Sequence, residues 1–236
     1  MVIAGLQKMT LLDYPGKVAC TVFLQGCNFR CPFCHNSDLL GHDGSSMMDR
    51  AELMAFLNKR RGLLDAVCIT GGEPTLQPDL PELIAEIKAL GFLVKLDTNG
   101  SRPDVLKRLV ADGLLDYVAM DIKNGPERYA ETVGLPAINL QPIEESIVFL
   151  MNGHVPYEFR TTVVDELHDE VSVRHIGEWL KRLAPDATTP PFFFQPYADR
   201  DSVLMSGLHT PNKEKIDAFA ASLQPFTDSV SVRGMD

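Results

Sequence analysis

Residues 18–36, VACTVFLQGCNFRCPFCHN, join a short apolar run to a loop that carries three cysteines. The run, 18–25, is rich in β-branched and aromatic side chains, as is typical of a buried strand. A helical pattern follows from about Asp49. This stretch therefore predicts a strand, a loop and a helix in succession, with the chemically distinctive residues in the loop.

The same alternation of an apolar run and a helical segment recurs five more times, so the sequence predicts repeated βα units and a mainly parallel sheet. The predicted strands are 66–70, 92–97, 117–120, 157–164 and 192–195, and the predicted helices are 80–90, 103–112, 127–133 (short), 142–152, 170–183 and 212–223. Val230 and Val232 predict a last edge strand. A closed TIM barrel has eight βα units, and this chain has six. The sequence therefore predicts an α/β fold, a partial, open (β/α)6 TIM-type barrel. We expect one domain over residues 1–236.

The composition is that of a globular protein, with 45% hydrophobic and 23% charged residues. The formal net charge of -10 opposes binding to nucleic acid or to anionic membranes. No run of eighteen apolar residues is present, and the first residues lack the pattern of a signal peptide. We therefore expect a cytoplasmic protein with neither nucleic acid nor a membrane as partner.

Three of the five cysteines, Cys27, Cys31 and Cys34, crowd into eight residues. In a cytoplasmic chain such crowding indicates metal or redox chemistry rather than disulfides. Cys20 and Cys68 lie inside apolar runs, and we expect both to be small buried core residues.

Thiolates bind iron–sulfur clusters or zinc, and a cubane cluster needs a ligand on each of its four irons. Three cysteines would leave one iron open to a chelating substrate. The alternative is a zinc site that adds His35, but adjacent Cys34 and His35 are poorly placed to reach one ion, and structural zinc usually draws on two separated pairs. The spacing favours the cluster.

Polar and glycine residues also follow the next three predicted strands, where chemistry gathers in parallel barrels. A glycine pair allows the backbone to approach a ligand closely, and Glu73 is suited to hold that segment or an ammonium group. The three segments are Gly71-Gly72-Glu73-Pro74, Thr98-Asn99-Gly100 and Asp121-Ile122-Lys123.

The Cys-x3-Cys-x2-Cys spacing, with an aromatic residue before the last cysteine, resembles the radical S-adenosylmethionine (SAM) superfamily, and Gly71 to Pro74 resembles its second motif. The resemblance implies one [4Fe–4S] cluster on the three cysteines, whose open iron chelates the amino and carboxylate groups of SAM. It assigns further cofactor contacts to Phe33 (adenine), Gly71, Gly72 and Glu73 (methionine ammonium), and Thr98 and Asn99 (ribose).

Within the superfamily, residues 12–17 (LDYPGK) and 23–36 (FLQGCNFRCPFCHN) resemble activating enzymes of glycyl radical enzymes, particularly those of anaerobic ribonucleoside-triphosphate reductase. Asp121 and Lys123 resemble the Asp-x-Lys motif that activases place beside SAM, which implies catalytic and cofactor-binding roles for both. The resemblance is strong over about the first half of the chain and thin beyond Val133. Arg160 is a candidate for the cofactor carboxylate, the alternative being a helix-facing or paired surface arginine.

The resemblance implies that a donor such as flavodoxin or ferredoxin reduces the cluster, that SAM is cleaved, and that the 5′-deoxyadenosyl radical removes hydrogen from a glycine of the partner enzyme. Many activases carry a ferredoxin-like insert, but the chain has no spare cysteines for one, and it has Gln195-Pro196-Tyr197 where some activases have a histidine. Two alternatives stay open. One is a radical SAM enzyme for a small molecule such as a 7-deazaguanine precursor, and the other is a non-enzymatic iron–sulfur or zinc module.

Overall fold

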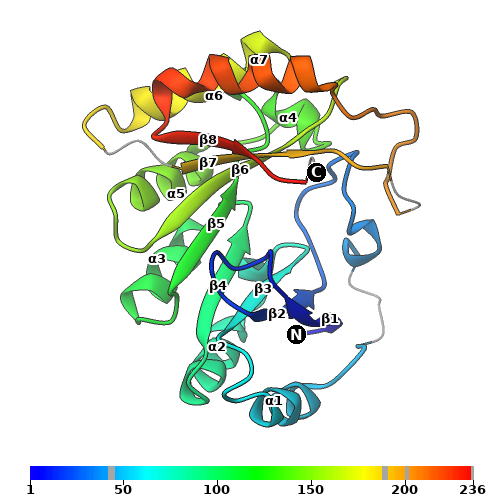
Figure 1. The fold of residues 1–236 in the computed structure, drawn as a ribbon, viewed down its shortest axis with the longest axis vertical. Coiled ribbons are helices and arrows are strands. Elements are labelled where there is room, and N and C mark those ends of the chain that lie inside the picture. The colour runs from blue at the N-terminus through cyan, green and yellow to red at the C-terminus, as the bar shows by residue number, and fades with distance from the viewer. Residues whose placement is uncertain (42–45, 188–190, 200–201, 235–236) are drawn as a thin grey trace. The chain divides into compact units, whose positions relative to one another are not determined.

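The computed structural model describes residues 1–41, 46–187, 191–199 and 202–234. The chain forms two compact units. Unit 1 comprises residues 1–28, 38–98 and 102–119, and unit 2 comprises 29–37, 99–101 and 120–236. The eight strands of the described residues follow one another in the sheet in chain order, from β1 to β8 (Figure 1).

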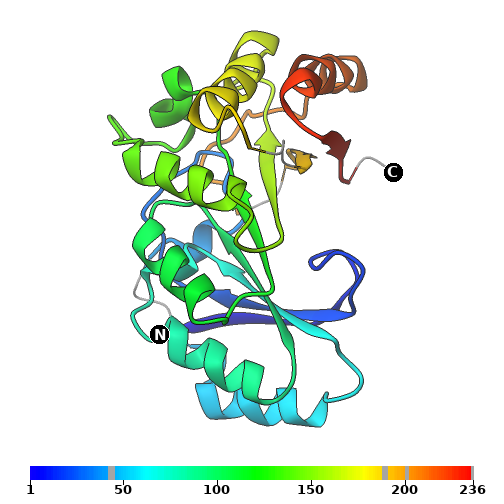
Figure 2. The ribbon, with the colours of Figure 1, turned by 90° about the vertical axis from the view of Figure 1, so that its left-hand side faces the viewer.

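Unit 1 is built on three parallel strands, in which Ala19 is paired with Ala66 and Ala66 with Leu93. The side chains of these strands are mostly buried, and helices α1 and α2 lie side by side against them (Figures 1 and 2). Its elements are β1 (Ile3–Thr10), β2 (Ala19–Leu24), α1 (Arg50–Lys59), β3 (Ala66–Gly71), η2 (Pro74–Leu76), α2 (Leu80–Ala89), β4 (Leu93–Thr98) and α3 (Pro103–Ala111), and the short helix η1 (Ser37–Leu39) begins at its boundary with unit 2.

Strand β1 is an addition to the predicted elements, and it pairs antiparallel with β2. The turn between them closes through a hydrogen bond of 3.2 Å from the backbone N of Lys17 to the carbonyl O of Tyr14. Pro15 and Gly16 occupy its centre, and Gly16 has the positive φ, 68°, that a type II turn needs at its third position. Part of the 12–17 string therefore shapes this hairpin.

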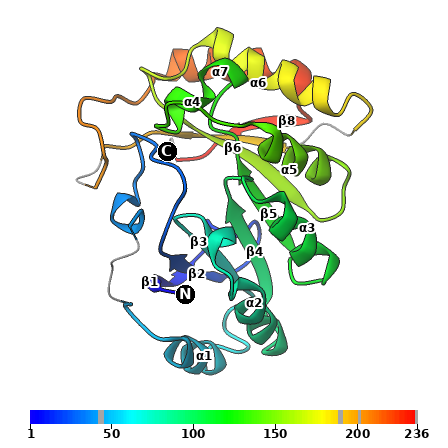
Figure 3. The same cartoon turned by 180° about the vertical axis from the view of Figure 1, so that it is seen from behind.

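Unit 2 contains three further parallel strands, in which Phe159 is paired with Phe192 and Phe192 with Val230. Helices α6 and α7 lie side by side on one face of this sheet (Figures 1 and 3). Its elements are β5 (Tyr117–Asp121, whose first three residues belong to unit 1), η3 (Pro126–Arg128), α4 (Tyr129–Thr132), α5 (Gln141–Met151), β6 (Tyr157–Val163), α6 (Glu170–Leu183), β7 (Pro191–Pro196), α7 (Lys213–Leu223), η4 (Gln224–Phe226) and β8 (Ser229–Val232).

All six predicted βα units are present, and the edge strand predicted at Val230 and Val232 is β8. Helices α1 and α6 both begin with a capping box, in which Asp49 pairs with Glu52 and Asp169 with Ser172. Among the described residues, the strand order runs from β1 to β8 without pairing its two ends, so the α/β fold is the open type. None of the described helices is both long and apolar enough to span a membrane.

Candidate cofactor site

The glycine motif ends strand β3 in unit 1, and its backbone is packed tightly against the end of β2. A Cβ atom on Gly71 would lie 2.2 Å from the carbonyl O of Leu24, and one on Gly72 would lie 2.1 Å from the carbonyl O of Gly26. Gly71 also has a φ of 120°. Hydrogen bonds from Gly72 N to Leu24 O (2.9 Å) and from Glu73 N to Gly26 O (2.7 Å) fix this approach. Both glycines are required by the fold itself.

The carboxylate of Glu73 is buried and braces two strand ends of unit 1. Its Oε1 accepts a hydrogen bond of 3.1 Å from the backbone N of Thr75, a second from the Thr75 hydroxyl, and a third of 2.8 Å from the hydroxyl of Thr98. Glu73 therefore holds its own segment in place, one of the two roles expected from the sequence, and it orients Thr98 at the end of β4.

Asp121, Lys123 and Arg160 come together in unit 2. Oδ2 of Asp121 lies 2.9 Å from Nζ of Lys123, and Oδ1 accepts from Arg160 at 3.0 Å (Nε) and 2.9 Å (Nη2). The side chains are 27%, 14% and 11% exposed, respectively. Arg160 is thus not an ordinary surface arginine, because strand β6 directs it onto the Asp-x-Lys motif. We call these three side chains the charge trio.

The charge trio is fully ionised at neutral pH. Burial raises the pKa of Asp121, but Arg160 and Lys123 outweigh it and bring the pKa down to about 2. Burial likewise opposes the charge of Lys123, but the neighbouring Asp121 carboxylate raises the pKa of that ammonium above its ordinary value. Two cations and one anion sum to a single positive charge, so the trio is suited to bind a carboxylate.

The cysteine loop is fastened by its backbone. Arg30 N donates to the carbonyl O of Val133 (2.8 Å), Cys34 N to that of Cys31 (3.0 Å) and Met205 N to that of Pro32 (3.0 Å). Cys31 is buried, and Cys27 and Cys34 are partly exposed. Cys27 lies in unit 1 and the other two in unit 2. Among the described residues, no group of three or more His, Cys, Asp or Glu side chains lies ready to hold a metal ion.

The remaining candidate residues lie in loops and turns or in the core. Phe33 is buried in the cysteine loop. Oδ1 of Asn99 accepts from the backbone N of Ser101 (2.9 Å), so Asn99 shapes a turn. His35 stacks on Tyr197, with ring centroids 5.6 Å apart. Cys20 and Cys68 are wholly buried, as predicted, and burial raises the pKa of both thiols, that of Cys20 to about 12.

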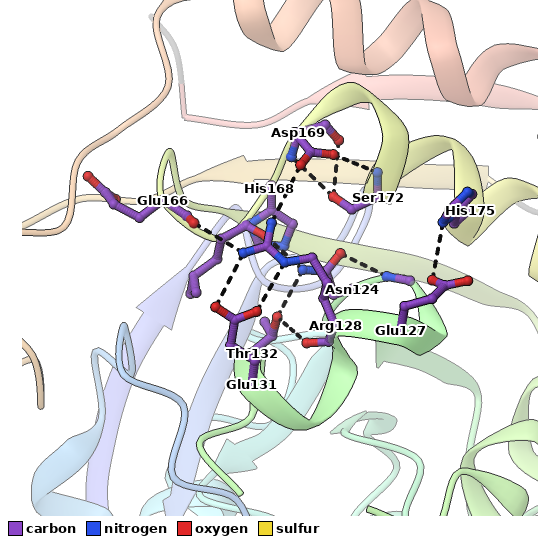
Figure 4. Close-up of polar contacts among 12 residues, drawn as sticks. Asn124, Glu127, Arg128, Glu131, Thr132, Glu166, His168, Asp169, Ser172 and His175 are labelled. Atoms are coloured by element: carbon purple, nitrogen blue, oxygen red, sulfur yellow. Dashed lines mark hydrogen bonds and ion pairs between the residues drawn. The ribbon is translucent and has the colours of Figure 1, made fainter. Parts of the chain in front are cut away.

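A polar network around Asn124, the residue that follows Lys123, was not foreseen from the sequence (Figure 4). The buried amide of Asn124 donates to Thr132 Oγ1 and to the carbonyl O of Leu167, both at 2.8 Å, and accepts from Gly125 N at 2.8 Å. Buried His168 lies with its Nε2 2.9 Å from the carbonyl O of Lys123. The one sequence signal was that Asn124 directly follows the Asp-x-Lys motif.

Around this network, the side chains of η3 and α4 are tied to the start of α6. Arg128 pairs with Glu131 (3.0 Å) and with Asp169 (3.6 Å). His175 of α6 lies 3.2 Å from Glu127 (Figure 4). Residues 124–132, which follow the Asp-x-Lys motif, are therefore held by buried hydrogen bonds of Asn124 and by ion pairs of Glu127 and Arg128.

Residues 21–177 match the Radical SAM superfamily. A protein of Methanocaldococcus jannaschii, provisionally named a glycyl-radical enzyme activating enzyme, is 36% identical over 76% of this chain and 75% of its own length. Among solved structures, a domain of a pyruvate-formate lyase-activating enzyme from Bacteroides vulgatus has a TM-score of 0.58 at 20% identity, covering 72% of this chain and 99% of that one. Streptococcus suis SuiB bound to S-adenosylmethionine has a TM-score of 0.68 at 11% identity, covering 91% and 52%.

The chain belongs to the radical SAM superfamily and, within it, to the glycyl-radical enzyme activating enzymes. It is therefore an oxidoreductase that uses a [4Fe–4S] cluster on three cysteines together with SAM. The two solved structures support the fold alone. The donor set fits this assignment, because three thiols within eight residues suit iron–sulfur chemistry and the charge trio suits an anionic cofactor group.

Proposed function

We propose that this enzyme installs a glycyl radical on an anaerobic ribonucleoside-triphosphate reductase. The observation that carries this choice of partner is the pair of strings at 12–17 and 23–36, which resemble that subgroup of activases nearly throughout. The partner supplies the glycine, and a flavodoxin or a ferredoxin supplies the electron. In this proposal residues 1–236 make up a single radical SAM domain with one cluster, and the enzyme works in the cytoplasm.

In this proposal Cys27, Cys31 and Cys34 are the cluster ligands. Cluster and SAM together supply the one-electron chemistry that breaks a carbon–sulfur bond of SAM and takes a hydrogen atom from the partner. The protein supplies binding, orientation and exclusion of water. Phe33, next to the last ligand, contacts the adenine.

Asp121, Lys123 and Arg160 orient the methionine end of SAM. Lys123 and Arg160 hold its carboxylate, and Asp121 fixes both cations through hydrogen bonds of 2.9 to 3.0 Å. Because the charges of Arg160 and Lys123 outweigh the effect of burial and hold the pKa of Asp121 near 2, these groups keep their charges throughout the working pH range.

The glycine motif contacts the ammonium group of SAM through backbone carbonyls. Support comes from the absence of room for a Cβ at Gly71 and Gly72. Glu73 keeps that backbone in place, and it positions Thr98 for a ribose contact, with Asn99 following at the same turn.

The experiment mixes anaerobically reconstituted enzyme, SAM and a strong reductant with a candidate reductase and records electron paramagnetic resonance spectra. A glycyl radical doublet is expected, and it should vanish when the reductase's C-terminal glycine is changed to alanine. If 5′-deoxyadenosine is instead released only with a small purine-like substrate and no doublet forms, the enzyme acts on a small molecule and the proposed partner is wrong.

A further inference from the structure

The hydroxyl of Tyr129 is a buried polar group that the proposed cofactor contacts do not use. Tyr129 begins helix α4, is 0% exposed, and packs edge-on against Trp179 with ring centroids 5.9 Å apart. In the part of the chain that the structure describes, its hydroxyl makes no complete hydrogen bond, although the backbone N–H of Lys123 approaches its oxygen. A buried hydroxyl left unpaired costs free energy, so native proteins seldom keep one without a reason.

Helix α4 is fixed directly against the cysteine loop within unit 2. Val133 closes the turn that begins at Tyr129, its N donating to Tyr129 O at 3.0 Å, and its own carbonyl accepts from Arg30 N at 2.8 Å. At the next residue, a Cβ on Gly134 would lie 2.1 Å from the carbonyl O of Arg30. The position of Tyr129 is thus set by the backbone that also carries Cys31.

The charged groups that act on the Tyr129 hydroxyl, Lys123, Cys31 and Asp121, all belong to the proposed cofactor site. Burial raises the pKa of Tyr129 most, the Lys123 ammonium and backbone N–H lower it, and Cys31 and Asp121 raise it further. The pKa of Lys123 responds to both Cys31 and Tyr129, so the three side chains lie within electrostatic reach of one another. A phenol carries its proton at neutral pH, so what Tyr129 offers at this place is a hydrogen-bond donor.

We propose that the Tyr129 hydroxyl donates a hydrogen bond to a sulfur atom of the cluster at Cys31, either the cysteine sulfur or a neighbouring sulfide, and thereby raises the cluster's reduction potential. The inference rests on the proposed role of Cys31 as a ligand. One electron from a low-potential reductant increases the negative charge on the sulfurs while Tyr129 keeps its proton. A donor stabilises the more negative state, and hydrogen bonds to the sulfurs are among the factors that set such potentials.

The test is a redox titration of reconstituted Tyr129→Phe in the absence of SAM, followed by the electron paramagnetic resonance signal of the reduced cluster. At the potential that half-reduces the wild type, the ratio of reduced to oxidised cluster should fall about tenfold in the variant, a shift of about 59 mV for one electron. Tyr157→Phe is the matched control, because Tyr157 lies at the start of β6, away from the strand ends that carry the motifs. Its titration should coincide with that of the wild type.

A second measurement uses the same variant without its cluster. Urea unfolding of the apo protein should show a midpoint equal to or above that of the wild type, because Tyr129→Phe removes a buried hydroxyl that lacks a partner. A lower midpoint would mean that the apo protein, or a water within it, already satisfies the hydroxyl, and the inference would be wrong.

The outcomes separate the two proposals. Wild-type protein that assembles no iron–sulfur cluster would overturn the proposed cofactor ligands and this inference with them. A cluster present in both proteins, with the same midpoint potential in wild type and Tyr129→Phe, would overturn this inference alone. A change confined to the affinity for SAM would also overturn it, because the hydroxyl would then face the cofactor and not the sulfur.

Discussion

Glu73 follows the end of strand β3 and Asp121 is the last residue of strand β5. Their carboxylates are held by different kinds of hydrogen-bond donor. Oε1 of Glu73 accepts from neutral donors, a backbone N–H and the hydroxyls of Thr75 and Thr98. Asp121 accepts from two cations, Lys123 and Arg160. Neutral donors make Glu73 a brace for the backbone, whereas the cations make Asp121 the centre of an electrostatic site. The two motifs therefore have different sensitivities to charge.

The largest effect is expected for Asp121→Asn in the apo protein. The change keeps the shape of the side chain but removes the counter-charge that Lys123 and Arg160 share, so the free energy of unfolding should fall by about 2–3 kcal/mol, less than for a fully buried pair because Asp121 is 27% exposed. Urea unfolding measures it. The matched control is Asp104→Asn, an exposed aspartate paired with Arg102 in the first turn of α3, which should cost less than about 1 kcal/mol. Equal effects at the two positions would show that the trio is not electrostatically special.

The pH dependence tests the same charge. The pKa of Asp121 is lowered from 3.8 to about 2 in the folded protein, so its stabilisation is fully present above pH 4 and is lost as the pH falls through 2. The difference in unfolding free energy between wild type and Asp121→Asn should therefore shrink by about 2 kcal/mol between pH 5 and pH 2. Urea titrations at a series of pH values provide the comparison. A difference that stays constant over this range would contradict the ionised trio.

At Glu73 the charge should matter less than the acceptor. Glu73→Ala loses the bonds to Thr75 and Thr98 and should reduce the free energy of unfolding by about 2 kcal/mol, whereas Glu73→Gln keeps an acceptor and should lose less than about 1 kcal/mol. Chemical denaturation of the apo variants distinguishes the two. If Gln were as damaging as Ala, Glu73 would depend on its charge in the same way as Asp121.

The smallest effect is expected for Thr98→Val, which removes one donor to Glu73 at nearly constant volume and should cost about 1 kcal/mol. In a Glu73→Ala background the same change should cost almost nothing, because its partner is already gone. A double-mutant cycle by urea unfolding measures the coupling. Additive losses would mean that the 2.8 Å contact contributes nothing to the brace.

The sequence predicted the six βα units, because the periodicity of each strand and helix is local and strong. It also predicted that polar and glycine residues follow the strands. It did not predict strand β1, since Ile3–Thr10 includes a glycine and has no sustained alternation of buried and exposed positions. It named Arg160 but could not tell whether that side chain meets Asp121, because the pairing depends on the register between β5 and β6. Tyr129 and Asn124 were missed for the same reason, since a buried hydroxyl or amide acquires meaning only from its neighbours in space.

The most direct test of the central claim is the release of 5′-deoxyadenosine by the reconstituted chain. Wild-type protein with about four irons per chain, SAM and a strong reductant should release it, and Cys27→Ala, Cys31→Ala and Cys34→Ala should each lose both the iron and the product, while Cys20→Ala and Cys68→Ala keep both. Wild-type protein that carries stoichiometric zinc without sulfide, or that holds four irons and cleaves no SAM under these conditions, would contradict the account.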